Sequence, residues 1–438
     1  MTQNQALDIM RMGYNVFLTG DAGTGKTHVL STYISNLRKK NIPVAVTAST
    51  GIAATHIDGV TIDSWSGLGI RDDITDRELQ EMTHKYHLRR RIERAKVLII
   101  DEISMIHGKR FDAYDRILRF LRNVPLPFGG MQIVLSGDLF QLPPVSRARN
   151  NIDFIFKSKA WKELDLRYCY LRIPKRQTDE RFLRLLSDIR HNSVDETTYE
   201  LLADRQYIPD GKESDYTKLY THNVDVDAIN QRELDRIPSE TRSYFMSSVG
   251  PSSLTDNMKR TCLAPEKLDL KKGALVMFVR NSYEKGYVNG TLGKVVGFDG
   301  NGDPQVKIIS GSIITATSAS WTIMDDDKIV AQITQIPLRL AWAITVHKSQ
   351  GMTLDRAEID LSKSFVEGMG YVALSRVKNL NGLRLLGINQ MALRVNPEIS
   401  EIDEYLQKIS DETLKNLKKM GFLKKIMKQR KFMYKLTS

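Results

Sequence analysis

The segment from Gly20 to Thr27, GDAGTGKT, has the residue types and spacing that bind the phosphates of a nucleotide. It follows a short apolar run and precedes a helical pattern, so main-chain N–H groups can turn toward phosphate oxygens at the start of a helix. Lys26 would reach the β and γ phosphates, and the hydroxyl of Thr27 would ligate Mg²⁺. The alternative is a glycine turn that only begins a helix, but the strand–loop–helix context favours a site for ATP and Mg²⁺. The residues predicted to hold the nucleotide in this loop are Gly20, Ala22, Gly23, Thr24, Gly25, Lys26, Thr27 and His28.

Two adjacent acids, Asp101 and Glu102, close the apolar run VLII. At a strand end in such a domain, Asp101 would hold Mg²⁺ and Glu102 would polarise the attacking water. The alternative is a pair of solvated loop acids. Gln141 follows the next apolar run and could bind the γ phosphate or its water, although it could also be a polar loop residue before a Pro-Pro turn.

Two arginines farther along the chain, Arg176 in IPKRQ and Arg376 in VALSRV, could contact the phosphates from a second domain. A single arginine on a helix is more often a surface cation, so the spacing leaves both alternatives open. The predicted catalytic residues are Lys26, Glu102, Gln141, Arg176 and Arg376, and the predicted metal ligands are Thr27 and Asp101.

The first third of the chain alternates apolar, β-branched runs with helical patterns. The runs cover residues 15–19, 43–48, 96–101 and 132–138, and a polar group ends each one. This alternation predicts an α/β domain with a parallel sheet, whose ligands bind beyond the carboxyl ends of the strands. The four polar endings are therefore expected at one edge of the sheet.

A second alternation predicts a second α/β domain of similar construction. Its segments are residues 218–223, 344–351, 356–361, 370–377 and 383–388. Residues 286–336 differ, because β-branched residues are broken there by Gly-Asn and Gly-Asp turns. We interpret them as a small β-barrel inserted into the second domain.

Composition and charge limit the class of protein. The chain has 438 residues, of which 26% are charged and 41% hydrophobic, as in a soluble protein with two or three domains. The net charge of +12 favours a polyanionic partner, but nine Lys or Arg residues and no acid follow Glu412. This tail is either a surface helix packed on the body or a basic arm that binds DNA. Two cysteines, no expected signal peptide and no bilayer-spanning apolar run predict a reducing compartment. If the host is a prokaryote, the expected location is cytoplasmic and nucleoid-associated.

The order of these motifs resembles that of the superfamily-one 5′→3′ DNA helicases of the PIF (petite integration frequency) type, in the RecD-like branch. The matching strings, from about Gln3 to Gly387, are FLTGDAGTGKT, TASTGIAAT, GVTIDSWSGLG, LIIDEISM, LSGDLFQLPPV, PKRQTDERFLRLLSDIR, THNVDVDAIN, PLRLAWAITVHKSQGMTLD and GYVALSRV. The resemblance implies an α/β fold with two RecA-like P-loop domains, each with a parallel sheet, and a small inserted SH3-like β-barrel. It implies ATP between the two domains and single-stranded DNA across them.

The resemblance also assigns roles to single residues. It places Gln3 at the adenine-reading position, with Gln5 as the second candidate, and it makes Arg176 and Arg376 trans-acting arginines. The residues for which it implies DNA contacts are Thr50, Gly51, Ser64, Trp65, Thr221, Asn223, Thr345, His347 and Lys348. Taken alone, His347 would more readily be a core histidine.

Two positions depart from the family pattern. Asp63 stands where the family usually has histidine, and a carboxylate repels phosphate, so direct DNA contact by Asp63 is in doubt. Met369 stands where a glutamine often precedes YVALSR. Trp65 keeps an aromatic face suited to base stacking, although it could also simply be a core aromatic residue. Trp342, in the apolar string RLAWAI, is expected in the core.

We predict five parts of the chain. They are a first RecA-like domain at 1–170 with a wedge-type insertion at about 56–92, a second RecA-like domain at 171–285 and 337–400, the inserted β domain at 286–336, and a basic helical tail at 401–438. The loop SGLGIRDD, residues 66–73, is the predicted strand-separating pin, and residues 84–94 are predicted to be a solvated helix face.

The predicted function is that of an ATP-dependent 5′→3′ DNA helicase. Its expected partners are single-stranded DNA, 5′-tailed or forked duplex DNA and structured DNA, which it would bind as a monomer. Two alternatives remain open from the residues: a translocating ATPase without strand separation, and a nucleotide-gated switch that binds single strands without stepping. Stimulation of the ATPase by single-stranded DNA and unwinding of tailed duplexes distinguish these functions.

Overall fold

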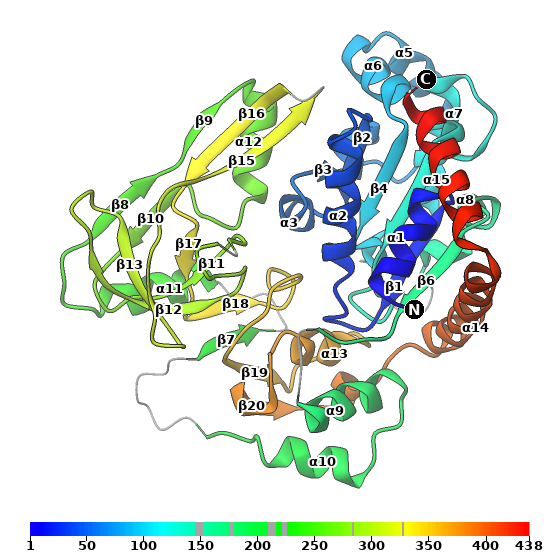
Figure 1. The fold of residues 1–438 in the computed structure, drawn as a ribbon. Coiled ribbons are helices and arrows are strands. Elements are labelled where there is room, and N and C mark those ends of the chain that lie inside the picture. The colour runs from blue at the N-terminus through cyan, green and yellow to red at the C-terminus, as the bar shows by residue number, and fades with distance from the viewer. Residues whose placement is uncertain are drawn as a thin grey trace. The chain divides into compact units, whose positions relative to one another are not determined.

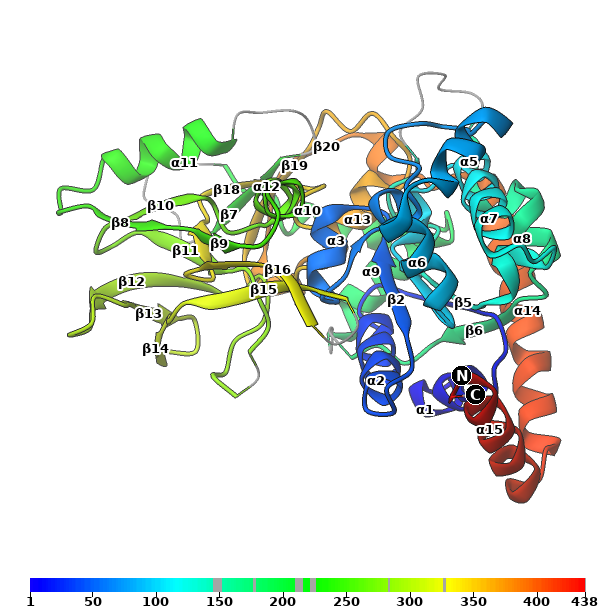
Figure 2. The same cartoon turned by 90° about the horizontal axis from the view of Figure 1, so that it is seen from above.

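The computed structural model describes residues 1–144, 152–175, 179–208, 216–220, 226–282, 284–325 and 328–437. The chain divides into two compact units. The first contains Met1–Lys175 and Pro397–Ser438, and the second contains Arg176–Met324 and Lys328–Asn396. Figure 1 labels the elements of both units, and Figure 2 shows the same elements from above.

A sheet of six parallel strands, in the order β3-β2-β4-β5-β1-β6, forms the centre of the first unit. Its strands are β1 Val16–Gly20, β2 Val44–Ala48, β3 Val60–Thr61, β4 Val97–Asp101, β5 Gln132–Ser136 and β6 Arg167–Leu171. The four runs predicted from the sequence correspond to β1, β2, β4 and β5, so the prediction of a parallel α/β sheet is confirmed.

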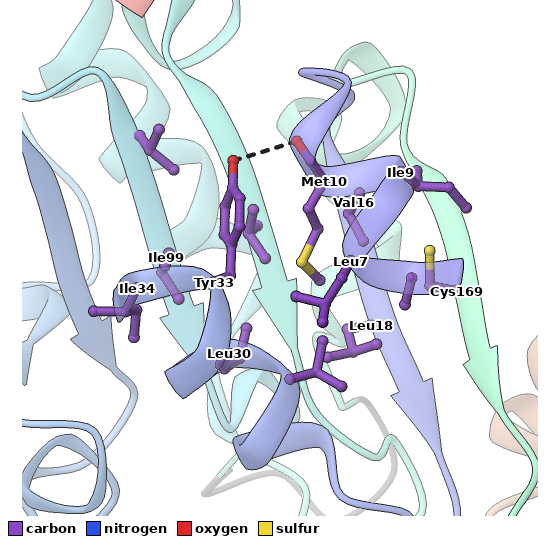
Figure 3. Close-up of a cluster of buried hydrophobic side chains, with 14 of the residues drawn as sticks. Leu7, Ile9, Met10, Val16, Leu18, Leu30, Tyr33, Ile34, Ile99 and Cys169 are labelled. Atoms are coloured by element: carbon purple, nitrogen blue, oxygen red, sulfur yellow. Dashed lines mark hydrogen bonds between the residues drawn. The ribbon is translucent and has the colours of Figure 1, made fainter. Parts of the chain in front are cut away.

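Helices cover both faces of this sheet. They are α1 Gln3–Arg11, α2 Lys26–Arg38, α3 Gly51–His56, α4 Ile62–Ser66, α5 Asp76–Thr83, α6 Tyr86–Arg94, α7 Gly108–Arg122, α8 Lys159–Glu163, α14 Pro397–Lys419 and α15 Phe422–Thr437. Val16 and Leu18 of β1 join the core of α1 and α2 shown in Figure 3, where the hydroxyl of Tyr33 donates to the carbonyl of Met10 at 3.2 Å. Phe17 points to the opposite face and packs on an aromatic ring of α8. Two covered faces explain why β1, β4 and β5 are buried along their whole length and are mostly apolar.

The segment predicted as an insertion at about 56–92 contains α4, α5 and most of α6. It also contains β3, which pairs with β2 at the edge of the main sheet. Arg91 of α6 donates to the carbonyl oxygens of Trp65 at 3.0 Å and Ser64 at 2.6 Å. The solvated helix predicted at 84–94 is therefore tied to α4 by one of its arginines.

The basic tail folds back on the first unit as α14 and α15. The hydroxyl of Ser410 in α14 accepts the N–H of Tyr170 in the edge strand β6 at 3.0 Å, and the hydroxyl of Tyr170 donates to Asp403 at 3.1 Å. In both views α15 lies beside α1, and the ring of Phe432 fills the space next to Gly13 that a Cβ would need. Of the two alternatives for the tail, the structure has the packed surface helix.

The second unit contains a parallel sheet of four strands in the order β18-β7-β19-β20. These strands are β7 Thr217–Tyr220, β18 Ala343–Thr345, β19 Ala357–Leu361 and β20 Leu383–Ile388. The helices that accompany them are α9 Glu180–Arg190, α10 Glu196–Ala203, α11 Val226–Asp235 and α13 Met369–Ser375. The prediction of a second α/β region is thereby confirmed.

The rest of the second unit is rich in antiparallel strands. Five of them form a sheet in the order β14-β13-β12-β11-β17, with bounds Ile313–Thr315, Pro304–Ile308, Leu292–Phe298, Leu275–Phe278 and Leu338–Leu340. The others are β8 Arg242–Phe245, β9 Ser247–Val249, β10 Lys267–Leu270, β15 Ala319–Asp325 and β16 Lys328–Gln335, with helix α12 Ser252–Thr261. Trp342 packs against the core of the five-stranded sheet, as expected. Among the described strands β14 and β17 are the sheet edges, so closure into a barrel and the domain limits stay predictions.

Candidate functional site

The loops with the predicted site residues of the first unit leave from one edge of its sheet. In the strand register, Ala48 at the end of β2 lies opposite both Thr61 of β3 and Asp101 of β4. Farther along the sheet, Leu18 of β1 lies opposite Ser136 of β5. The ladder of main-chain hydrogen bonds thus aligns the four predicted strand ends, those of β2, β4, β5 and β1, and adds the end of β3 on the other side of β2.

The phosphate-binding loop joins β1 to α2 through glycines with positive φ angles. Gly25, the N-cap of α2, has φ 86°, and an added Cβ would lie 2.2 Å from Nε2 of Gln3. Any larger residue would therefore be strained and would displace Gln3. Within the described chain no side chain caps this end of α2, so its first N–H groups can serve an anion.

Side chains of the loop divide into buried and accessible groups. Ala22 and Thr24 are buried, and the hydroxyl of Thr24 donates to the carbonyl of Asp21 at 2.9 Å. The ammonium group of Lys26 donates to the carbonyl oxygens of Gly20 at 2.8 Å and Asp21 at 3.1 Å. Gly23 accepts the N–H of Lys175 at 2.8 Å, while Thr27 and His28 are exposed in the first turn of α2. Hydrogen bonds within the loop thus stabilise its conformation, while Thr27 stays accessible to solvent.

Gln3, and not Gln5, reaches the phosphate-binding loop. The side-chain amide of Gln3 donates to the carbonyl of Thr24 at 3.0 Å. Gln5 belongs instead to a capping box at the start of α1, where its side chain accepts the N–H of Thr2 at 2.9 Å. The structure therefore favours Gln3 for the position assigned to adenine recognition.

The two acids after β4 differ in environment. Asp101 is only 5% exposed, and this burial raises the pKa of its carboxyl group, against the opposing effects of the Glu102 N–H and the Lys26 charge. Glu102 is partly exposed and has a left-handed backbone, with φ 52° and ψ 48°. Its N–H donates to Oδ1 of Asp101 at 2.9 Å. These contacts describe one buried carboxylate and one accessible carboxylate, not two solvated loop acids.

Gln141 is buried beside the end of β5, with 5% of its surface exposed. Its N–H donates to the carbonyl of Asp138 at 3.0 Å, and Oδ1 of Asp138 accepts the N–H of Phe140 at 3.2 Å. The side-chain oxygen of Gln141 has no hydrogen-bond partner among the residues that the structure describes. A buried amide oxygen without a protein partner fits an acceptor for a water molecule better than the alternative of a solvated loop residue.

These groups suit a nucleotide with Mg²⁺. A threonine hydroxyl and an aspartate carboxylate, from Thr27 and Asp101, are the hard oxygen ligands that Mg²⁺ accepts together with phosphate oxygens. Over the described ranges no three His, Cys, Asp or Glu side chains gather as a metal cage. A magnesium ion at this edge would therefore depend on the phosphates as well as on the protein.

Two of the DNA contacts implied for the first unit lie at neighbouring strand ends. Thr50 follows β2, and its hydroxyl accepts the N–H of Ala53 at 3.2 Å to begin α3, whose first residue is Gly51. Ser64 lies in α4, directly after β3. Trp65 is only 7% exposed, because α4 turns the indole into the interior. The predicted base-stacking face of Trp65 is therefore not available, and this part of the prediction is corrected.

The carboxylate of Asp63 interacts with side chains of the helix α7. Its carboxylate forms a salt bridge with Arg110 of α7 at 2.5 Å and accepts a hydrogen bond from the hydroxyl of Tyr114 at 2.5 Å. Arg110 also contacts Asp72 at 3.1 Å and the carbonyl of Gly69 at 2.9 Å. Because these protein groups occupy the carboxylate of Asp63, the structure supports the expectation that Asp63 does not contact DNA directly. Sequence reasoning missed Arg110, because 47 positions separate it from Asp63 and no local pattern pairs them.

In the second unit, Arg376 ends α13 and is 2% exposed, so it is not a surface cation. Its Nε donates to the carbonyl of Val372 at 3.0 Å, and its Nη2 donates to the hydroxyl of Ser375 at 2.9 Å. Arg190 of α9, which the sequence did not single out, is 1% exposed and donates to the hydroxyl of Tyr371 at 3.2 Å. Two buried arginines thus donate hydrogen bonds to residues of α13, the helix that the GYVALS segment forms.

The segment TVHKSQG follows β18 of the second unit. Thr345 ends the strand, and its hydroxyl accepts the N–H of Lys348 at 3.2 Å. His347 is exposed, so the alternative of a core histidine is wrong. The ammonium group of Lys348 lies 3.9 Å from Asp227, and Met369 is buried at the start of α13. The remaining predicted residues, Arg176, Thr221 and Asn223, lie outside the described residues.

Comparison with known families and proteins gives consistent matches. A family model described as PIF1-like helicase matches residues 3–198, and one described as the DNA helicase Pif1 2B domain matches residues 253–298. The ATP-dependent DNA helicase Pif1 of Psychrobacter sp. is 42% identical over 473 residues, which cover 94% of this chain and 72% of that protein. The ATP-dependent DNA helicase PIF1 of Xenopus laevis is 37% identical over 93% of this chain, which spans 64% of the length of that protein.

Solved structures give the same result. Bacteroides sp. Pif1 in complex with ADP-AlF4 has a TM-score of 0.77 at 30% identity, covering 93% of this chain and 96% of that one. Bacteroides Pif1 with ADP-AlF3 and single-stranded DNA has a TM-score of 0.60 at 31% identity, covering 92% and 95%. A structure of two coordinating Pif1 helicases at forked double-stranded DNA also has a TM-score of 0.60 at 31% identity, covering 94% of this chain and 97% of that one.

None of the described helices combines the length and apolar character that a bilayer crossing requires.

The contrast between Gln3 and Gln5 gives a matched test. Gln3→Ala removes the amide beside the phosphate-binding loop, so we expect the KM for ATP to rise about five- to tenfold with little change in kcat. Gln5→Ala removes only a helix cap and should cost about 0.5–1 kcal/mol of stability without changing the KM. Steady-state ATPase rates over a range of ATP concentrations measure both. An unchanged KM in Gln3→Ala, or an equal rise in both variants, contradicts the assignment.

Proposed function

Because this chain belongs to the PIF1-like helicase family and is an ATP-dependent DNA helicase, we propose that it moves 5′→3′ along single-stranded DNA and separates duplex strands as it moves. The observation that carries the proposal is the aligned sheet edge of the first unit. Loops assigned to DNA follow β2 and β3, and loops assigned to the nucleotide follow β4, β5 and β1. This one edge of the sheet would therefore form a rigid strip that carries both the DNA-binding and the nucleotide-binding loops.

In this proposal the first unit supplies most of the ATPase chemistry. Lys26 leaves the carbonyl oxygens of its own loop and binds the β and γ phosphates. Glu102, the more accessible acid, accepts a proton from the attacking water. Gln141 uses its buried amide oxygen to orient that water. Mg²⁺, held by Thr27 and Asp101, would neutralise developing charge on the phosphates.

The second unit is proposed to complete the nucleotide site. Arg176 and Arg376 would stabilise charge on the γ phosphate, as trans-acting arginines do. The burial of Arg376 supports this role, because a guanidinium held by main-chain and hydroxyl oxygens keeps a fixed position. We propose RecA-like domains at 1–170 and at 171–285 with 337–400, and an SH3-like barrel at 286–336.

We further propose that each unit holds the DNA strand separately. Thr50, Gly51 and Ser64 would contact it from the first unit, and Thr345, His347 and Lys348 from the second, together with Thr221 and Asn223. Hydroxyl and amide groups with one lysine bind phosphate and sugar without selecting a base. A nucleotide-dependent change in the spacing of the two sets would then move the strand.

The loop at 66–73 has the properties of a strand-separating pin. Ile70 is 98% exposed at its tip. The loop around it is held, because Arg71 donates to two of its carbonyl oxygens at 2.7 Å and Arg110 donates to the carbonyl of Gly69 at 2.9 Å. A stiff loop with an apolar tip is suited to wedge between base pairs.

The proposed partners are single-stranded DNA, 5′-tailed or forked duplex DNA and structured DNA. We propose action as a monomer, in the cytoplasm and with the nucleoid if the host is a prokaryote. Sedimentation of the protein on a forked duplex that has room for two copies tests the monomer directly.

The polarity and the nucleotide site can be tested together. We expect the wild-type protein to unwind a 5′-tailed duplex and to leave a 3′-tailed duplex intact. Lys26→Ala should abolish ATPase and unwinding, because the γ phosphate loses its cation, while single-strand binding measured by fluorescence anisotropy remains. Unwinding of only the 3′-tailed substrate would reverse the polarity, and ATPase activity in Lys26→Ala would contradict the site.

A second test separates unwinding from translocation. Ile70→Ala removes the tip of the pin, and we expect the unwinding rate to fall about three- to tenfold, since each base-pair step costs about 1.4 kcal/mol to open. This loss should exceed any loss of DNA-stimulated ATPase. Ile313→Ala, at a residue 59% exposed in β14, is the matched control and should unwind normally. Equal unwinding by the two variants would contradict the pin.

A further inference from the structure

Ser49 lies at the junction between the two halves of the aligned edge. It follows β2 directly and precedes Thr50, the residue assigned to DNA. Its N–H donates to the carbonyl of Asp101 at 3.1 Å, and its hydroxyl donates to the carbonyl of Glu102 at 2.6 Å. A single residue on the DNA side of the edge thus binds the main chain of both acids on the nucleotide side.

The hydrogen bond to Glu102 acts on a strained conformation. Glu102 has φ 52° and ψ 48°, a left-handed geometry that is unfavourable for a residue with a Cβ. Asparagine and aspartate adopt this conformation more readily, and they account for most of the other described positions of positive φ outside glycine. The ψ angle of Glu102 sets the direction of its carbonyl, which the Ser49 hydroxyl holds. Ser49 therefore helps to fix the backbone from which the Glu102 carboxylate projects.

Ser49 is also linked to the residues assigned to DNA, because the next residue in the chain is Thr50. The hydroxyl of Thr50 accepts the N–H of Ala53 and so sets the start of α3, with Gly51 as its first residue. A shift of this start on strand binding must pass through the Ser49–Thr50 peptide. The Ser49 hydroxyl and N–H would transmit that shift to Glu102 and Asp101 over two hydrogen bonds.

We propose that Ser49 is a positioning residue that couples DNA contact at Thr50 and Gly51 to the geometry of Glu102. This inference rests on the proposed function, because it assigns a route by which bound DNA stimulates hydrolysis. Ser49 contacts neither the nucleotide nor the reacting water in this role. Its effect is therefore on kcat in the presence of DNA, and not on the affinity for either ligand.

The test compares Ser49→Ala and Ser49→Thr with a control in the same loop-and-helix segment. Thr55→Ala removes a hydroxyl that donates to the carbonyl of Ile52 at 2.7 Å, a hydrogen bond between two residues of α3. ATPase rates are measured over ATP concentration both without DNA and at saturating oligo-dT, together with the Kd for oligo-dT and the melting temperature. Ser49→Ala should lower kcat about three- to tenfold, the effect of one hydrogen bond. The KM of Ser49→Ala for ATP and its Kd for oligo-dT should stay within about twofold of the wild-type values, because the proposed effect is on kcat alone.

Ser49→Thr keeps a hydroxyl and should restore kcat to within about twofold of wild type, and Thr55→Ala should behave as wild type. An unchanged kcat in Ser49→Ala overturns the proposal, as does a loss that Ser49→Thr does not restore. A weaker Kd with an unchanged kcat would make Ser49 a DNA contact instead. A wild-type ATPase that oligo-dT does not stimulate would overturn the proposed function itself, whereas a stimulated wild type with an identical Ser49→Ala would overturn only the coupling.

Discussion

The hydrogen-bond register of the central sheet is the constraint on which the rest of the first unit depends. Because Ala48 of β2 is paired with both Thr61 of β3 and Asp101 of β4, the loops that follow these three strands cannot move independently at their roots. The sheet is buried on both faces, so its strand ends form a rigid strip. The catalytic residues proposed after β4 and the DNA contact proposed after β2 are separated by one strand spacing, about 4.8 Å. Coupling over so short a distance requires only local hydrogen bonds.

The loops on this strip combine fixed and adjustable parts. Gly25 and Glu102 have left-handed backbones that the surrounding contacts maintain. Lys26, by contrast, donates to carbonyl oxygens of its own loop, an arrangement that a phosphate can replace. Gln3 links this loop to α1, and α1 is in turn packed against the C-terminal helix α15 through Gly13 and Phe432. The tail thus stabilises the element that positions Gln3.

The sequence predicted the parts of the site that obey local rules. The phosphate-binding loop, the apolar strands and the acids after β4 were predictable because period, spacing and residue type act within a few positions. Contacts between distant segments were not. Asp63 could be doubted as a DNA ligand, but its partners Arg110 and Tyr114 lie on a helix that no pattern connects to it. Trp65 was misread because an aromatic residue in a short motif has the same pattern whether it faces solvent or the core.

The same distinction applies to the tail and the pin. Amphipathic spacing in the last residues was compatible with a packed helix or a free arm, and contacts with distant residues, such as that of Phe432 with Gly13, distinguish them. The loop at 66–73 was recognisable as polar and glycine-rich. Its conformation, which leaves Ile70 almost completely exposed, is also held by Arg110 of the distant helix α7, and no local pattern predicts that contact.

Binding linkage between nucleotide and DNA tests the central claim most directly. The measurement is the Kd of the wild-type protein for oligo-dT, by fluorescence anisotropy, without nucleotide, with ADP and with ADP-AlF4. If both ligands act on one strip, the Kd must differ between these states by about fivefold or more, and oligo-dT must change the nucleotide affinity by the same factor. An identical Kd in all three states would contradict the claim that the sheet edge couples the two ligands.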